Sequence, residues 1–150
     1  MLRDDLQNSL KEAMKQRDMK TVSAVRLIIA GQKEKDVEAR GKGLEKASDT
    51  DLLAMMQTMI KQRSESIRIY KESGREDLAT KEQDEIDVIT RFLPKQLSES
   101  EAEAAIKEAI TATGAAGIKD MGKVMGALKA KYTGQMDFGA ASAIIKRLLA

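Results

Sequence analysis

Cysteine, histidine and tryptophan are absent from this sequence of 150 residues, and proline occurs once. Without cysteine the chain has no disulfide, no thiolate metal ligand and no cysteine nucleophile. Without histidine it lacks the commonest general base and the commonest zinc ligand. We therefore predict no catalytic residue, no metal site and no cofactor.

Long apolar runs are also missing. Charged residues begin at Arg3 and interrupt the first eighteen residues, which contain no apolar run of signal-peptide length. Nowhere do eighteen apolar residues follow one another. This pattern predicts neither a signal peptide nor a membrane-spanning helix. Together with the lack of cysteine, it predicts a soluble cytoplasmic protein with no membrane partner.

Apolar residues recur at helical spacing along the chain, and no alternation of strand length is sustained. With only four aromatic residues and nine methionines, the core must be filled mainly by aliphatic side chains and flexible Met. This composition favours helices over strands. We predict an all-α fold with helices at about 2–17, 20–40, 49–73, 75–92, 98–114, 120–132 and from 138 onward. In the first helix, the inward stripe is predicted to be Leu2, Leu6, Leu10 and Met14.

A boundary between two domains is predicted in the segment FLPKQL, Phe92 to Leu97. Pro94 ends the preceding helix because it has no backbone donor. Ser98 and Glu101 then form a capping box that opens the next helix, as Ser48 and Asp51 do earlier. An N-terminal helical bundle (1–93) is thus expected to join, through a proline-containing linker, a small three-helix tail domain (97–150).

The string GIKDMGKV, from Gly117 to Val124, resembles the phosphate-binding loop of nucleotide hydrolases. That loop needs Ser or Thr directly after Gly-Lys to hold magnesium, and it must follow a buried strand. Val124 takes the hydroxyl position, and a helix is expected upstream. A nucleotide hydrolase is therefore not predicted.

Two glycines, Gly122 and Gly126, lie one turn apart in the sixth helix, which is expected to begin at an Asp120 cap. Because glycine in a helix costs about 1 kcal/mol relative to alanine, the pair suggests that another backbone comes close. That backbone belongs either to a neighbouring helix or to a ligand. Lys119 and Lys123 at the helix start suit phosphate, and lysines without aromatic stacking would contact a nucleic-acid backbone without distinguishing bases.

Charge is unevenly distributed. Residues 97–118 carry one Lys and four Glu, whereas residues 119–150 carry six Lys or Arg and two Asp. A basic C-terminal element favours an anionic partner, although a solvated mixed surface would have the same composition.

Two further clusters have simpler alternatives. Glu82, Asp84, Glu85 and Asp87 resemble a metal or acid/base set, but four acids on a helix are more often a solvated face. The methionines at 55, 56 and 59 would line an adaptable groove or, as we expect, fill the core.

Two long strings, Lys61 to Glu101 and Asp120 to Leu148, resemble the YqeY-like proteins and the C-terminal helical and tail region of the GatB subunit of tRNA-dependent amidotransferase. This resemblance covers essentially the whole chain and implies two all-helical domains. In that subunit, and in some glutaminyl-tRNA synthetases with the same module, the tail contacts the outer corner of tRNA through shape and phosphates. The amidotransferase's catalytic domain lies outside the resemblance.

Carried over by position, the resemblance assigns tRNA contacts to the tail domain. Asp137 matches this region too, but capping a helix is its expected role. The predicted nucleic-acid-binding residues are Lys119, Gly122, Lys123, Gly126, Lys129, Lys131, Ser142, Lys146 and Arg147.

The resulting expectation is a non-catalytic tRNA-binding module, accessory to aminoacyl-tRNA metabolism and without DNA specificity. One alternative is a protein-interaction adaptor. Another is a component of glutamine-dependent amidation of misacylated tRNA (carbon–nitrogen ligase) that has no catalytic residues of its own. A protein partner in aminoacyl-tRNA metabolism is compatible with each.

Overall fold

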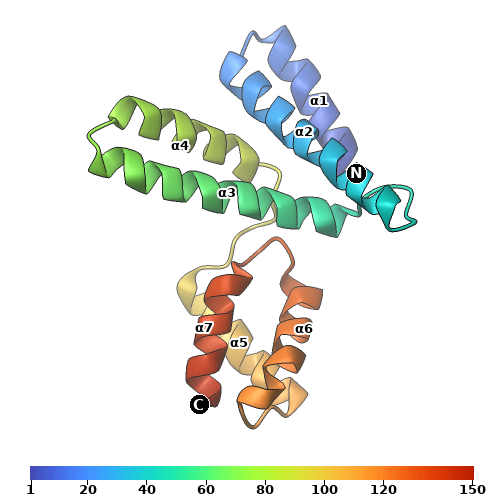
Figure 1. The fold of residues 1–150 in the computed structure, drawn as a ribbon, viewed down its shortest axis with the longest axis vertical. Helices are drawn as coiled ribbons and strands as arrows, with labels where there is room; N and C mark the ends of the chain where they lie inside the picture. The colour runs from blue at the N-terminus through green and yellow to red at the C-terminus, as the bar shows by residue number, and fades with distance from the viewer. The chain divides into compact units, whose positions relative to one another are not determined.

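The computed structural model describes residues 1–150 and is entirely helical outside turns, which confirms the all-α prediction (Figure 1). None of its helices is both long and apolar enough to cross a membrane. The α-helices are α1 (Leu2–Lys15), α2 (Met19–Gly41), α3 (Asp49–Glu72), α4 (Glu76–Thr90), α5 (Glu99–Thr113), α6 (Met121–Tyr132) and α7 (Phe138–Leu149), with a short 3₁₀ helix η1 (Ile118–Asp120) before α6.

Residue contacts divide the chain into two compact units, Met1–Leu93 and Pro94–Ala150. In the first unit, α1 lies beside α2 and α3 beside α4, so that two helical hairpins pack against each other (Figure 1). Their shared core contains Leu6, Val25, Ile28, Leu52 and Met56, all fully buried. Burying each such side chain contributes about 1.5 to 3 kcal/mol, which holds the four helices together.

The caps that begin the helices follow local sequence signals. The capping boxes of Ser48 with Asp51 and of Ser98 with Glu101 are both formed, as predicted. Asp18 caps α2 by accepting hydrogen bonds from the N–H and the hydroxyl of Thr21, at 3.2 and 2.6 Å. These side chains satisfy N–H groups that have no partner within the helix.

One part of the predicted core of α1 is wrong. Met14 is 52% exposed, and Ala13 takes the buried position after Leu2 and Leu6. A spacing of four residues drifts around a helix of 3.6 residues per turn, so the fourth member of the stripe has rotated out of the core.

The second unit packs α5, α6 and α7 around Ile106, Val124, Leu128 and Ile145. The segment before α5 is tied to the α6–α7 turn, where the N–H of Leu97 donates to the carbonyl of Gln135 at 2.9 Å.

Candidate nucleic-acid interface

The string GIKDMGKV forms the turn and helix start between α5 and α6. Gly114 ends α5 in the left-handed conformation, with φ of +67°, and η1 runs directly into α6. A helix, and not a strand, precedes this string, so the structural context of a nucleotide-hydrolase loop is missing.

Asp120 does not cap α6 as predicted, because its side chain makes no hydrogen bond to the amides of that helix. Its carboxylate turns back and accepts from the N–H of Ala116 at 3.0 Å. That hydrogen bond, with smaller contributions from the Gly117 amide, Lys123 and Lys119, holds the pKa of Asp120 below its ordinary value. The 3₁₀ turn explains the difference, since the helical backbone already begins upstream of Asp120.

Gly122 and Gly126 lie on the exposed face of α6. A Cβ atom built on either glycine meets no atom within 4 Å, so neither α5 nor α7 packs against them. The alternative of a neighbouring helix within the second unit is therefore wrong. Ala130, one turn further on, is exposed too, and it extends this strip of small residues.

Three exposed lysines flank the strip. At 100° per residue, Lys119 and Lys123 lie on one side of the glycines and Lys129 lies on the other. The ammonium group of Lys129 is 6.0 Å from the ring centre of Phe138, at the start of α7. We call Lys119, Gly122, Lys123, Gly126 and Lys129 the α6 face.

Lys131 does not belong to this face. Its ammonium nitrogen is 3.8 Å from Glu108 of α5 and 5.4 Å from the ring centre of Tyr132. Two residues beyond Lys129, the helix has turned about 200°, which directs Lys131 toward α5.

The remaining predicted residues lie on α7. Ser142 is half-buried and Lys146 is exposed, while Arg147 is 3.3 Å from Glu103 of α5. Asp137 caps α7 as expected, accepting from the N–H groups of Gly139 and Ala140 at 2.8 and 3.4 Å. The predicted set is thus divided among the α6 face, α7 and a lysine facing α5.

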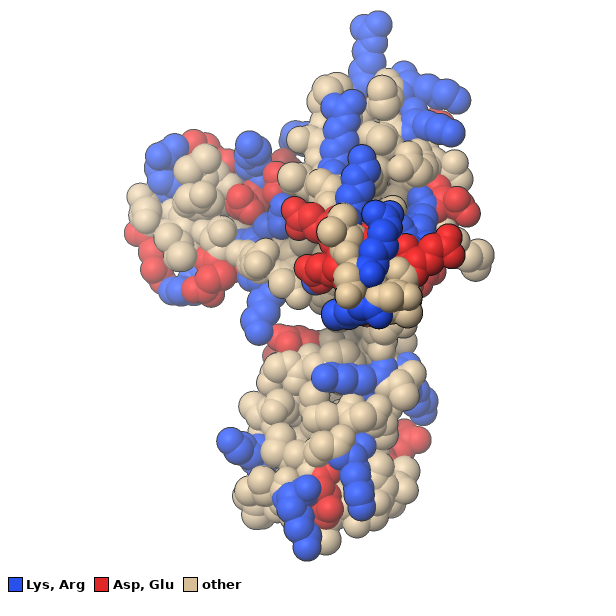
Figure 2. Space-filling view, turned by 45° about the vertical axis from the view of Figure 1, so that its right-hand side comes forward, with Lys and Arg blue, Asp and Glu red and all other residues tan.

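Net positive charge is confined to the second unit. Pro94–Ala150 holds eight Lys or Arg and six Asp or Glu, whereas Met1–Leu93 holds eighteen of each. On the second unit, Figure 2 shows lysine and arginine side chains standing apart on a surface that is mostly uncharged.

The acidic cluster of α4 takes part in structural contacts. Asp84 pairs with Lys20 at 3.1 Å, and Glu85 accepts from Arg63 at 2.8 Å. The Arg63–Glu85 pair is largely buried and ties α3 to α4.

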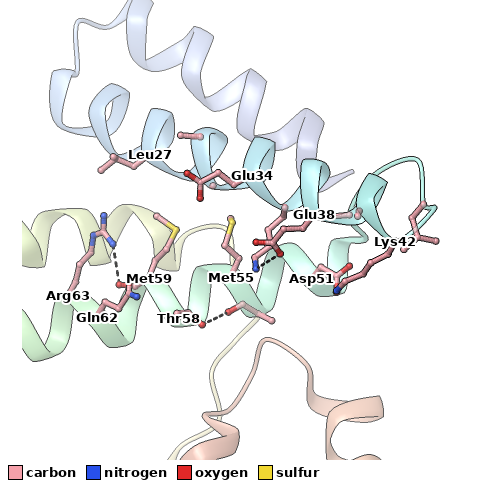
Figure 3. A pocket seen from close by; sticks show the side chains of 17 residues that line it. Leu27, Glu34, Glu38, Lys42, Asp51, Met55, Thr58, Met59, Gln62 and Arg63 are labelled. Carbon is pink, nitrogen blue, oxygen red and sulfur yellow. Dashed lines mark hydrogen bonds and ion pairs between the residues drawn. The ribbon is translucent and has the colours of Figure 1, made fainter.

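A groove with a volume of about 810 Å³ lies between α2 and α3 (Figure 3), and the sequence did not show that α2 forms one side of it. Met55 and Met56 belong to the buried core and Met59 packs against it, so the expected core role is confirmed, and Met55 and Met59 also line the groove. Gly31 of α2 faces Met55, and a Cβ at Gly31 would lie 2.7 Å from its sulfur. A lone glycine inside a helical pattern was the available signal.

Three fungal proteins are similar to this chain. The chain is 33% identical over 103 residues to "Altered inheritance of mitochondria protein 41, mitochondrial" of Lachancea thermotolerans, a match that covers 69% of this chain and 54% of that protein. Its namesakes match at 35% over 98 residues in Candida glabrata (65% and 52% covered) and 33% over 88 residues in Saccharomyces cerevisiae (59% and 46%). The chain spans about half the length of these relatives.

The names of these relatives contradict the prediction of a cytoplasmic location, because each is named as a mitochondrial protein. The prediction relied on missing cysteine and missing apolar runs. Neither property distinguishes a protein of the cytoplasm from a protein inside a mitochondrion, so neither supports the predicted location.

Family membership depends on a match along nearly the full chain. The model of the YqeY-like protein family matches residues 3–149 and so covers both units. This agrees with the strings from Lys61 and from Asp120 that first suggested the resemblance. The chain is a member of the YqeY-like protein family.

Proposed function

We propose that this protein is a non-catalytic tRNA-binding protein that serves aminoacyl-tRNA metabolism and contacts tRNA through its C-terminal unit. The observation that carries the proposal is the α6 face, where Gly122 and Gly126 are open to solvent between three exposed lysines. The resemblance of Asp120–Leu148 to the tail of the amidotransferase subunit supports tRNA as the ligand.

The proposed contact is made with the sugar–phosphate backbone. Lysine ammonium groups neutralise phosphates, and helix positions without side chains allow a nucleic-acid backbone to come near the helix axis. No Arg fork is held in place on the α6 face to distinguish bases, so we expect recognition by shape and no DNA sequence preference. Arg147, which is engaged with Glu103, and Lys131, near Glu108, contribute less in this scheme.

The test is a titration of total tRNA over a range of salt concentrations. Binding driven by counterion release weakens linearly on a log–log plot, with a slope that grows with the number of phosphates neutralised. The triple variant Lys119→Glu, Lys123→Glu, Lys129→Glu should lose affinity and show a shallower slope.

A matched control changes the same net charge on the first unit. Lys11, Lys61 and Lys81 are exposed and form no ion pair. Their replacement by Glu should leave tRNA affinity nearly unchanged. Equal losses of tRNA affinity in the two triple variants would show that binding depends only on net charge. Unchanged affinity in the α6 variant would show that the α6 face is not the binding site.

We further propose that the two units are separate domains joined at Pro94, the finer arrangement expected from the sequence. The division of contacts at Leu93–Pro94 supports this, as does the presence of a separate core in each unit.

Absence of catalysis is part of the proposal. Incubated with misacylated tRNA, glutamine and ATP, the chain should form no amidated product. Product formation by the purified chain would replace this proposal with the carbon–nitrogen ligase alternative.

The groove between α2 and α3 favours a second candidate, a protein-interaction adaptor. Met59 is only partly buried in this groove, and its flexible, polarizable side chain suits a surface able to accept a partner's apolar side chains. Affinity purification before and after nuclease treatment separates the two candidates, because an adaptor keeps its protein partners when RNA is destroyed.

A further inference from the structure

The outward face of α2 carries apolar side chains that nothing in the chain covers. Met19 is 64% exposed, Leu27 42% and Val37 63%, which places three of the eight exposed large apolar residues on one helix. Ser23 and Ala30 lie between them and are exposed as well. Apolar side chains gathered on one face mark an interaction surface more often than scattered ones do.

Two opposite charges on this face lie at equal distances from Ala30. Arg26 lies four residues before it and Glu34 four residues after it, so each is about 6 Å along the helix axis from Ala30. Neither side chain has an ion pair or hydrogen bond within the chain. Two opposite charges at equal distances from one point form a surface that complements itself after a twofold rotation.

We propose that α2 of a second copy of this chain packs antiparallel against this face, with the twofold axis at the level of Ala30. In that arrangement Arg26 meets the partner subunit's Glu34, and Glu34 meets the partner subunit's Arg26. Alanine at the centre allows the two helices to approach within the usual 8 to 10 Å or so.

A hollow in the face supports the same register. Met19, Val22, Ser23, Arg26 and Leu27 line a depression of about 400 Å³. The first four of these positions have the spacing i, i+3, i+4 and i+7, which forms the hole of knobs-into-holes packing.

The knob for this hole is Val37. It lies seven residues after Ala30, and Ser23 lies seven residues before it, each about 10 Å along the axis. The antiparallel pairing therefore places the partner subunit's Val37 at the level of Ser23, inside the hollow. The register set by Arg26 and Glu34 is thus also the one that buries an exposed valine.

The chemistry of the face favours a second copy over a nucleic acid. Glu34 projects from the same side of α2 as Leu27 (Figure 3) and would repel phosphates. A polyanion would also leave Leu27 and Val37 uncovered. A second α2 satisfies both the charges and the apolar side chains.

The test is sedimentation velocity on the nuclease-treated full chain over a wide range of concentration. We expect a dimer that dissociates on dilution. Arg26→Glu and Glu34→Arg each place like charges opposite one another, and each should weaken dimerisation at least tenfold. The double variant R26E/E34R reverses both pairs and should restore the dimer.

Two control variants test whether the effect belongs to this face of α2. Lys11→Glu changes charge as much as Arg26→Glu does, at an exposed position of α1, and should dimerise normally. Val37→Asp should weaken the dimer by removing the knob, with circular dichroism confirming that each variant is folded. A monomer at every concentration, a dimer lost on nuclease treatment, a dimer unaffected by Arg26→Glu, or a double variant as weak as the single ones would each overturn the proposal.

Discussion

Arg3 and Asp36 form a two-pronged ion pair that joins the start of α1 to the far half of α2. The two terminal nitrogens of Arg3 lie 2.8 and 2.7 Å from the two carboxylate oxygens of Asp36. One of these nitrogens also donates to the carbonyl of Ala47, whose own N–H donates to Asp36 at 2.9 Å. The side chains are only 19% and 13% exposed, so this pair anchors the loop before α3.

Acid should weaken the first unit through Asp36. The hydrogen bond from Arg3 is the largest cause that holds the pKa of Asp36 at about 2, against 3.8 ordinarily. A lowered folded-state pKa adds stability above the unfolded value, and that stability is lost as the pH falls through the folded value. We expect about 2 kcal/mol to be lost between roughly pH 5 and pH 2, measured by urea unfolding at several pH values. Asp36→Asn should be less stable at pH 7 and should lack this part of the pH dependence.

Gly31 should tolerate no β-branched side chain while Met55 keeps its position. Since a Cβ there would lie 2.7 Å from the Met55 sulfur, Gly31→Val forces α2 and α3 apart or displaces Met55. We expect a loss of about 1 to 3 kcal/mol, the range for overpacking. The variant Met55→Ala should recover part of it in a double-mutant cycle. Additive losses would show that the two residues do not meet.

Substitutions at Gly126 should affect stability and RNA binding differently. Because a Cβ there meets nothing, Gly126→Ala should stabilise the second unit by up to about 1 kcal/mol through helix propensity. Gly126→Leu should leave the melting temperature unreduced and lower tRNA affinity, because its side chain keeps a backbone ligand away. Unaltered affinity in a folded Gly126→Leu variant would contradict the proposed role of the glycines.

Replacing Arg17 by glycine should stabilise the protein. It is the one residue other than glycine with positive φ, at +58°, in the turn between α1 and α2. Arg17→Gly should raise the free energy of unfolding by about 0.5 to 1 kcal/mol, since glycine adopts this conformation without steric cost. Gly114→Ala, at φ of +67°, should lower it by a similar amount. Thermal unfolding measures both changes.

A core truncation in one unit should leave the other intact if the two units are separate domains. Leu128 is 1% exposed, and Leu128→Ala should cost about 2 to 5 kcal/mol within Pro94–Ala150. Hydrogen exchange followed by mass spectrometry should then show faster exchange in α5–α7 and unchanged protection around Ile28. Faster exchange around both residues would indicate one cooperative domain.

Local chemistry explains why much of the helical pattern was predictable. The hydroxyl of Ser48 meets the amide of Asp51 within one turn, so a few adjacent residues contain all the information needed for that helix start. The same holds for Ser98 and for the cap at Asp137. The family resemblance was likewise readable, since it depends on the order of residues.

Other features depend on which elements meet. Met14 is exposed because α2 covers a different side of α1. The groove beside Met55 exists only because α3 passes close to Gly31. None of these relations lies within one helical turn.

The sequence by itself determined the all-helical class, the helix caps, the family and the basic composition of the last 32 residues, because each depends on local order or on simple counts. Only the tertiary structure decided that Gly122 and Gly126 face solvent, that Lys131 lies near Glu108 and Arg147 near Glu103, and that α2 keeps an uncovered face. Helical periodicity tells which residues share a face, but the packing of distant segments decides which face is covered.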